Sequence, residues 1–146
     1  MFDASARNSQ GVSLNSNLLA GPKTQLQIPY LMTHLRMNPI VLIGDISRMF
    51  YALKYQKTPS NKGLLVEDLR DLYRFLWNEE DSKLAPQAYR VLAMLQGASD
   101  SPYISAATIH KHLDDVIAKA DDPDTIKAAE LIKLRLYIDD LVLSLG

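Results

Sequence analysis

The chain has 146 residues, of which 47% are hydrophobic and 23% are charged, a composition typical of a folded globular domain. Its formal net charge of −1 gives no overall basic field, although a basic cleft can exist within a neutral domain. Cysteine is absent, which excludes disulfide frameworks and thiolate zinc sites. The longest apolar stretch, residues 39–43, is far too short to cross a bilayer, and no signal peptide is visible, so an intracellular protein is expected.

The first part of the chain predicts a loop followed by a helix. Residues 3–23 are rich in serine, asparagine and glycine and end in a Gly-Pro pair, which is a loop signature. Apolar positions recur near helical spacing across residues 25–36. Pro29 fits only the first turn of a helix, so we expect the helix to begin close to that residue.

A strand and a short helix are predicted next. The apolar run 40–43, bounded by Gly44, predicts a buried strand. Residues 46–55 place their apolar side chains on one side, which predicts a short helix. A loop is expected around residues 59–63, while residues 65–72 fit both the helical and the strand period.

The middle of the chain predicts a hairpin and two helices. Residues 72–77 and 88–95 are two strand-like runs separated by a polar stretch, which predicts the hairpin. The segment 104–119 has the apolar spacing of an amphipathic helix. Asp122 is expected to cap another helix, with Pro123 at its first position.

The last segment changes to a period of two. Residues 134–138 and 141–145 alternate on either side of Asp139-Asp140, which predicts two strands that meet at an Asp-Asp turn. The whole order of elements predicts an α+β fold whose sheet is covered by helices on one face. Because the final apolar strand stops without a tail, and Met1 leads directly into a turn-like stretch, we expect a fragment of a longer protein.

Acidic residues at the ends of predicted strands are the candidates for chemistry. Asp45 follows the first strand, and Asp139 and Asp140 lie at the predicted hairpin tip. Strand ends hold carboxylates rigidly, and hard oxygen ligands without cysteine suit Mg²⁺ or Mn²⁺. Two such ions can activate one oxygen and stabilise another in a phosphoryl displacement. The plain alternative is that these aspartates are turn residues and helix caps.

Three histidines, His34, His110 and His112, are the other candidate metal ligands. Positions 110 and 112 lie two residues apart, and residues with that spacing on a helix point in different directions. We interpret these two as ordinary polar positions.

The residues around the three aspartates resemble motifs of reverse transcriptases. Residues 137–140 read Tyr-Ile-Asp-Asp, which is similar to the YxDD motif of that family. Asp45, followed five residues later by the aromatic Phe50, resembles the first palm motif. Gln-Gly at 96–97 with Ser-Pro at 101–102 resembles the second palm motif, and the three occur in the family's order.

More specifically, the chain is similar to the reverse transcriptases of BEL/Pao-type long-terminal-repeat retrotransposons. The matching stretches are residues 2–7, 13–15, 18–22, 45–50 and 74–77. The resemblance implies a single reverse transcriptase fragment over residues 1–146, with a fingers remnant at 1–24 and a palm with three motifs at 25–146. It implies a palm-like antiparallel sheet with helices packed on one face, truncated fingers and no thumb.

The resemblance also implies a role for each matching residue. The catalytic residues, which would bind two Mg²⁺ or Mn²⁺ ions, are Asp45, Asp139 and Asp140. The residues that would contact the deoxynucleotide or the primer are Phe50, Gln96, Gly97 and Tyr137. Phe50 would be the steric gate that rejects a ribose 2′-hydroxyl, although a core aromatic residue is the plain alternative. Gly97 would let the backbone approach template or substrate closely.

The implied activity is RNA-directed DNA polymerisation, in which deoxynucleotides are added to a primer 3′-hydroxyl. The implied partners are an RNA template, a DNA primer, deoxynucleotides and the remaining polyprotein (fingers, thumb and RNase H), with no membrane. The implied location is the cytoplasm, a virus-like particle or the nucleus. Because the family's triphosphate-gripping residues precede the matching region, we expect this fragment to be inactive alone. The alternatives are a domesticated or degenerate remnant that serves as a non-catalytic nucleic-acid-binding or interaction module, and an unrelated α+β domain.

Overall fold

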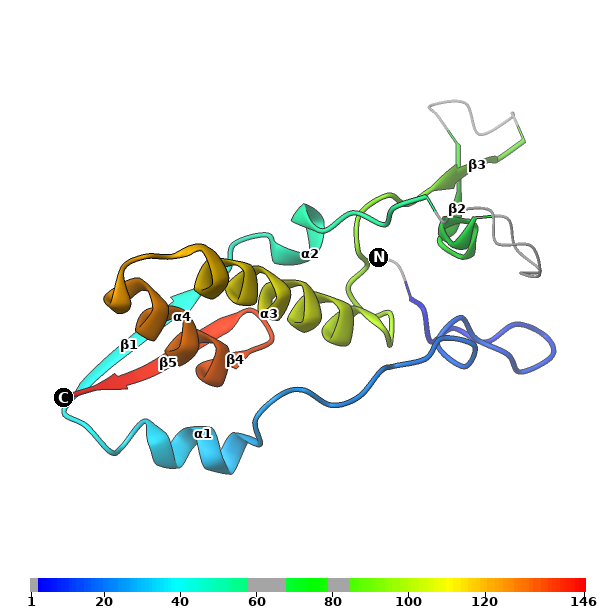
Figure 1. Cartoon of the computed structure of the whole chain (residues 1–146). Coiled ribbons are helices and arrows are strands. Elements are labelled where there is room, and N and C mark those ends of the chain that lie inside the picture. The colour runs from blue at the N-terminus through cyan, green and yellow to red at the C-terminus, as the bar shows by residue number, and fades with distance from the viewer. Residues whose placement is uncertain (1–2, 58–67, 79–84) are drawn as a thin grey trace. The chain divides into compact units, whose positions relative to one another are not determined.

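The computed structural model describes residues 3–57, 68–78 and 85–146 (Figure 1). Its helices are α1 (Ile28–His34), α2 (Met49–Ala52), the 3₁₀ helix η1 (Leu69–Leu72), α3 (Ser101–Lys119) and α4 (Pro123–Arg135). Its strands are β1 (Ile40–Asp45), β2 (Arg74–Trp77), β3 (Gln87–Arg90), β4 (Leu136–Tyr137) and β5 (Asp140–Leu145). The chain is therefore a mixed α+β protein with small antiparallel sheets, as the sequence predicts at that level. The loop expected around residues 59–63 lies outside the described residues, as does most of the polar stretch between β2 and β3.

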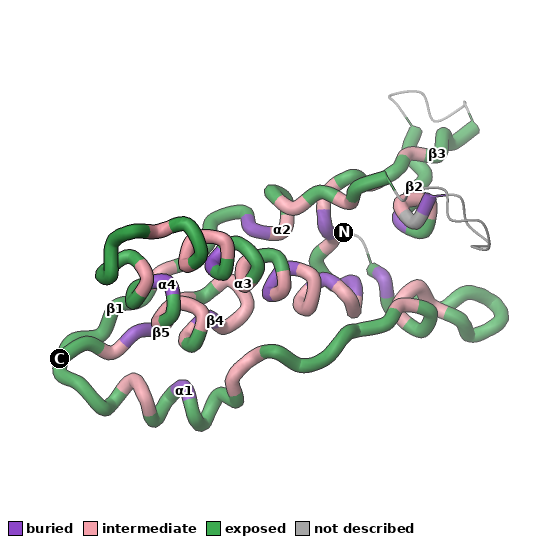
Figure 2. Tube along the Cα trace, viewed as in Figure 1, coloured by how far each residue is buried: buried purple, intermediate pink, exposed green. Residues whose placement is uncertain are grey.

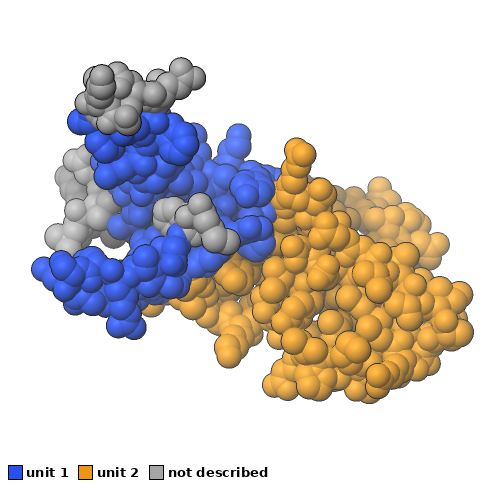
Figure 3. All heavy atoms as spheres, turned by 180° about the vertical axis from the view of Figure 1, so that it is seen from behind, with its two compact units in different colours: residues 1–18, 50–98 blue, residues 19–49, 99–146 orange. Residues whose placement is uncertain are grey.

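The chain divides into two compact units, each of which is described by itself (Figure 3). Unit 1 comprises residues 1–18 and 50–98 and contains the two-stranded sheet β2-β3. Unit 2 comprises residues 19–49 and 99–146 and contains the three-stranded sheet β1-β5-β4. In the described part of the chain, no helix is both long and apolar enough to cross a membrane.

Unit 2 is built from an antiparallel sheet and two long helices. The sheet is ordered β1-β5-β4, with β5 in the centre. Helices α3 and α4 pack side by side over the sheet (Figure 1), and both α4 and α1 contact β5. The buried apolar residues of these elements are Leu31, Ala106, Leu113, Ala129, Leu136 and Leu143.

The predicted helix starts are confirmed, with one shift. Helix α1 begins at Ile28, so that Pro29 lies in its first turn. Helix α3 begins three residues before the predicted start, because Pro102 is accommodated in its first turn. The side chain of Asp122 accepts hydrogen bonds from the backbone amides of Asp124 and Thr125, which caps α4 as predicted.

Strand β1 exists as predicted, but the prediction that it is buried is wrong. The exposed fractions are 61% for Ile40, 47% for Val41, 49% for Leu42 and 71% for Ile43 (Figure 2). The reason is its place in the sheet: β1 is an edge strand that pairs with β5 alone. A continuous apolar run usually indicates a strand covered on both faces, and here that inference does not hold.

The predicted Asp-Asp turn is displaced by one residue. Helix α4 continues through Arg135, because backbone hydrogen bonding along an established helix outweighs a short alternating pattern. Strand β4 is therefore only two residues long, and Tyr137 pairs with Asp140 in β5. The two residues of the turn are consequently Ile138 and Asp139.

Unit 1 contains the predicted hairpin in a shorter form. Strands β2 and β3 pair antiparallel, with the stacked rings of Phe75 and Tyr89 directly opposite each other. The segment 53–55 lies beside residues 92–94, because the amide of Tyr55 donates to the carbonyl of Leu92 at 2.9 Å. This pairing explains why the helix predicted over 46–55 is limited to α2.

An ion-pair cluster fixes the start of this hairpin. Asp68 caps η1 and pairs with Arg70 at 2.5 Å and Arg90 at 3.6 Å. Asp71 pairs with Arg74 at 2.9 Å and also with Arg90. The side-chain hydrogen bond from Arg70 is the main cause that lowers the pKa of Asp68 from 3.8 to about 2.

Candidate metal centre

The pairing of β1 with β5 brings the three predicted carboxylates together. Asp45, the last residue of β1, lies directly opposite Asp140, the first residue of β5. Asp139 precedes Asp140 in the turn. One carboxylate oxygen from each residue lies within 4.8 Å of the other two. The three aspartates that the resemblance assigns to one metal site are therefore close together in space, although Asp45 lies far from the other two in the sequence.

A backbone hydrogen bond continues the pairing of β1 with β5 by one residue beyond the ends of the two strands. The amide of Ile46 donates a hydrogen bond of 2.9 Å to the carbonyl oxygen of Asp139. This bond ties the turn to the end of β1. Asp45 and Asp140 are exposed and Asp139 is half-buried, so a cation from solvent can reach all three.

Two residues beside the carboxylates have left-handed backbone conformations. Arg48 has φ 56° and Ile138 has φ 59°, and these are the two non-glycine residues with positive φ in the described ranges. Positive φ is rare for a β-branched residue such as isoleucine. At Ile138 it falls on the first central residue of a two-residue hairpin turn, the place that glycine takes in a type II′ turn. Such outliers cluster at functional sites. Neither residue type favours this conformation, so it could not be predicted from the sequence.

The donor set fits a hard divalent cation. Opposite oxygens around one Mg²⁺ ion are separated by about 4.2 Å, since each Mg–O bond is about 2.1 Å. The observed upper limit of 4.8 Å therefore needs only a small side-chain adjustment to share one ion or to flank two. Three carboxylates in this space offer the hard oxygen ligands and the negative charge that such a cation requires.

The other predicted site residues lie in both units. Tyr137 is half-buried in unit 2 and pairs with Asp140 in the sheet. The three that belong to unit 1 are Phe50, half-buried in α2, and Gln96 and Gly97, both exposed. A side chain at Gly97 would meet open space, so its φ of 92° is the local feature that requires glycine. Its carbonyl accepts a hydrogen bond of 2.9 Å from the side chain of Asn15.

The histidines do not join the carboxylate group. Within the described ranges, the group of three or more metal-ligand side chains consists of aspartates alone. A ring nitrogen of His34 lies 3.0 Å from the guanidinium of Arg135, and its ring meets that of Tyr30 edge to face. His110 lies on α3 and lines a separate hollow.

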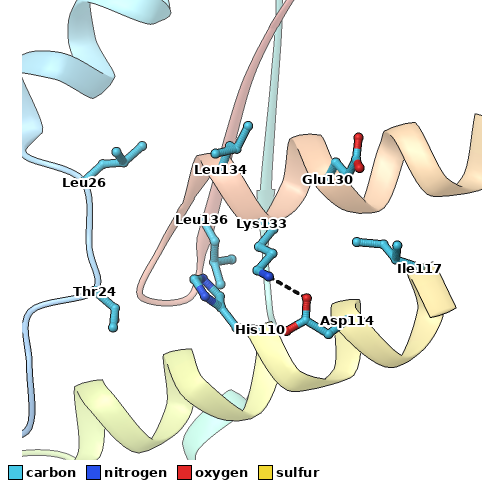
Figure 4. Close-up of a pocket in the computed structure, with 9 residues that line it drawn as sticks. All are labelled: Thr24, Leu26, His110, Asp114, Ile117, Glu130, Lys133, Leu134 and Leu136. Atoms are coloured by element: carbon cyan, nitrogen blue, oxygen red, sulfur yellow. Dashed lines mark hydrogen bonds and ion pairs between the residues drawn. The ribbon is translucent and has the colours of Figure 1, made fainter.

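That hollow, of about 620 Å³, lies within unit 2 between α3, α4 and an extended segment (Figure 4). An ion pair of 2.5 Å joins Lys133 of α4 to Asp114 of α3 across it. The lining residues are Thr24, Leu26, His110, Asp114, Ile117, Glu130, Lys133, Leu134 and Leu136. The hollow is therefore a different place from the carboxylate group.

Comparison with protein-family models, with curated proteins and with solved structures finds no match to this chain.

Proposed function

We propose that this chain is a segment of an RNA-directed DNA polymerase, the reverse transcriptase of a BEL/Pao-type retrotransposon. One observation carries the proposal: carboxylate oxygens of Asp45, Asp139 and Asp140 lie within 4.8 Å of one another. These residues come from two motifs far apart in the sequence, and the resemblance assigns both motifs to one metal site. If the match of residues 137–140 to the YxDD motif were accidental, there would be no reason for Asp45 to lie beside Asp139 and Asp140.

The proposal gives the sheet of unit 2 the role of the polymerase palm. An antiparallel sheet that carries Asp45 at the end of one strand, opposite a hairpin with the other two aspartates, supports that role. Residues 1–24 would be a fingers remnant. Phe50, Gln96, Gly97 and Tyr137 would contact the deoxynucleotide or the primer.

In this mechanism the protein contributes position and charge. Two divalent ions, when bound, supply the Lewis acidity that activates the primer 3′-hydroxyl and stabilises the leaving pyrophosphate. The three aspartates hold that charge in place, and the hydrogen bond from Ile46 to Asp139 keeps the turn beside β1. Phosphoryl transfer depends on such positioning more than on covalent chemistry.

Primer extension tests the proposal. A primed RNA template, Mg²⁺ and the four deoxynucleotides are supplied to this chain and to a longer chain extended at both ends with its flanking polyprotein. We expect extension by the longer chain and its loss in the Asp139→Asn variant of that chain. Asp121→Asn is the matched control, since Asp121 is exposed and lies outside the carboxylate group. Equal extension by the Asp139→Asn variant would overturn the proposal.

Metal binding by the 146-residue chain is a second test that needs no catalysis. Mn²⁺ titration followed by electron paramagnetic resonance should show binding that Asp139→Asn weakens and Asp121→Asn leaves unchanged. Absence of binding by the unsubstituted chain would contradict a metal centre at this place.

A further inference from the structure

Arg48 adopts a backbone conformation that glycine would adopt more easily. The amide of Met49 donates to the carbonyl of Ile46 at 3.2 Å, which closes a four-residue turn with Arg48 in its third position. Its φ is 56°, and a turn with positive φ at that position favours glycine or asparagine. Arginine at this position therefore costs conformational free energy that glycine would not, and residues with such strain are common at functional sites.

The side chain of Arg48 is available for a ligand. The residue is exposed, and its guanidinium makes no hydrogen bond or ion pair with any part of the chain that the structure describes. By contrast, Arg70 and Arg90 are occupied by carboxylates in unit 1.

The carboxylate centre is within reach of this side chain. Arg48 lies three residues after Asp45, and three residues span at most about 11 Å even when fully extended. The turn closed by Met49 shortens that distance, and both residues belong to unit 2. This separation is short enough for a ligand of triphosphate length to span the carboxylates and the guanidinium.

We propose that Arg48 contacts phosphate oxygens of a nucleotide bound at the carboxylate centre. This inference rests on the proposed polymerase function and names a residue that the resemblance does not assign. A guanidinium presents a planar fork of donors that matches two phosphate oxygens at once. Beside three carboxylates, it supplies the positive charge that a triphosphate needs. The proposal accounts for an arginine where the backbone favours glycine.

Two substitutions separate the side chain from the backbone. Arg48→Ala and Arg48→Gly both remove the guanidinium, but only glycine relieves the turn. Binding of dATP and of inorganic tripolyphosphate to the 146-residue chain, each with Mg²⁺, is measured by calorimetry. Both variants should bind both ligands about 10-fold more weakly, the loss expected for one charged hydrogen-bonding group. The Tm of Arg48→Gly should exceed that of Arg48→Ala by about 2–4 °C.

Controls distinguish a phosphate contact from a general charge effect. Lys127→Gln removes an exposed positive charge on α4 and should leave both affinities unchanged. Arg48→Lys keeps the charge without the fork and should bind with intermediate affinity. An equal loss in Lys127→Gln, or weaker binding of dATP with unchanged binding of tripolyphosphate, would overturn the proposal.

The result also separates this inference from the function on which it rests. Full affinity in Arg48→Ala, together with affinity lost in Asp139→Asn, would remove Arg48 from the site and leave the metal centre standing. Failure of the unsubstituted chain to bind either ligand would overturn the role of Arg48. If Mn²⁺ also failed to bind, the metal centre would fall with it.

Discussion

The amide of Ile46 donates a hydrogen bond of 2.9 Å to the carbonyl oxygen of Asp139. It continues the antiparallel pairing of β1 and β5 past Asp45 and Asp140, the last pair of the ladder. The carboxylates are therefore held by backbone bonds on two strands, which is the rigidity that a metal centre requires.

Metal binding should stabilise the fold through the carboxylates. A ligand present at about 100 times its Kd adds about 2.7 kcal/mol to folded-state stability, which for a chain of this size raises Tm by about 5–10 °C. Mn²⁺ should produce such a rise in the unsubstituted chain and in Asp121→Asn, measured by circular dichroism. Asp140→Asn should lose the rise while keeping its metal-free Tm, since Asp140 is exposed and asparagine has nearly the same shape. A metal-induced rise that survives in Asp140→Asn would contradict the assigned ligands.

The strained turn predicts an unusual response to glycine. Ile138→Gly removes a half-buried side chain but relieves a φ of 59°, which costs isoleucine about 1–2 kcal/mol. We expect a free energy of unfolding within about 1 kcal/mol of the unsubstituted chain, together with weaker Mn²⁺ binding because the turn is looser. Ile43→Gly, at an ordinary strand position, is the control and should lose about 1 kcal/mol. A larger loss in Ile138→Gly than in Ile43→Gly, by urea unfolding, would contradict the strain.

Gly21 is predicted to tolerate no side chain. Its φ is 74°, and a Cβ there would collide with the ring of Tyr103. Gly21→Ala should therefore lower the free energy of unfolding by about 2–4 kcal/mol, from backbone strain and overpacking together. Gly11→Ala isolates the strain, since Gly11 has φ 79° but open space around it. Equal losses in the two variants, by urea unfolding, would show that the collision contributes nothing.

Asp68 should make unit 1 sensitive to acid. Its pKa is lowered to about 2, chiefly by the hydrogen bond from Arg70, so the folded state binds its proton less readily than the unfolded chain. The stabilisation is therefore complete above about pH 4 and is lost as pH falls towards 2. Asp68→Asn keeps a capping side chain and should flatten the dependence of stability on pH between 4 and 2. Stability would be measured by urea unfolding at each pH. The same acid-induced loss of stability in Asp68→Asn would assign that loss to other carboxylates.

The exposed edge of β1 should promote self-association. An apolar edge strand offers unpaired backbone groups to another chain, and Ile43 is 71% exposed on it. Ile43→Lys should lower the apparent mass seen by light scattering at high protein concentration, with little change in Tm. Ile132→Lys, on the half-buried face of α4, is the contrasting variant and should lower Tm. Unchanged scattering in Ile43→Lys would show that this edge is not the associating surface.

Local signals predicted much of the secondary structure. Pro29, Pro123 and the capping side chain of Asp122 act within a few residues of where they stand, so their helix starts follow from the sequence. The exposure of β1 did not follow, because it depends on which strand is central in the sheet. The turn lies one residue earlier than predicted, at Ile138 and Asp139. The reason is that α4 continues through Arg135, into the segment whose alternating apolar residues predicted a strand.

The candidate site was predictable in its members but not in its geometry. Asp45, Asp139 and Asp140 could be named from motifs, since a motif preserves the residues that chemistry needs. The positive φ angles of Arg48 and Ile138 could not be predicted, because neither residue type favours that conformation. Strain is visible only where surrounding contacts enforce it.

The register of β1 against β5 has a consequence for folding order. Asp45 can pair with Asp140 only after most of the chain has been synthesised. The pairing is a long-range contact, so the entropy cost of closing the loop between the two residues precedes any gain from the contact. A slip of one residue would send every side chain of β1 to the opposite face and separate the carboxylates. In a nascent chain the three carboxylates thus come together only when this long-range pairing forms, and an ion bound to them, as proposed, would select the correct register.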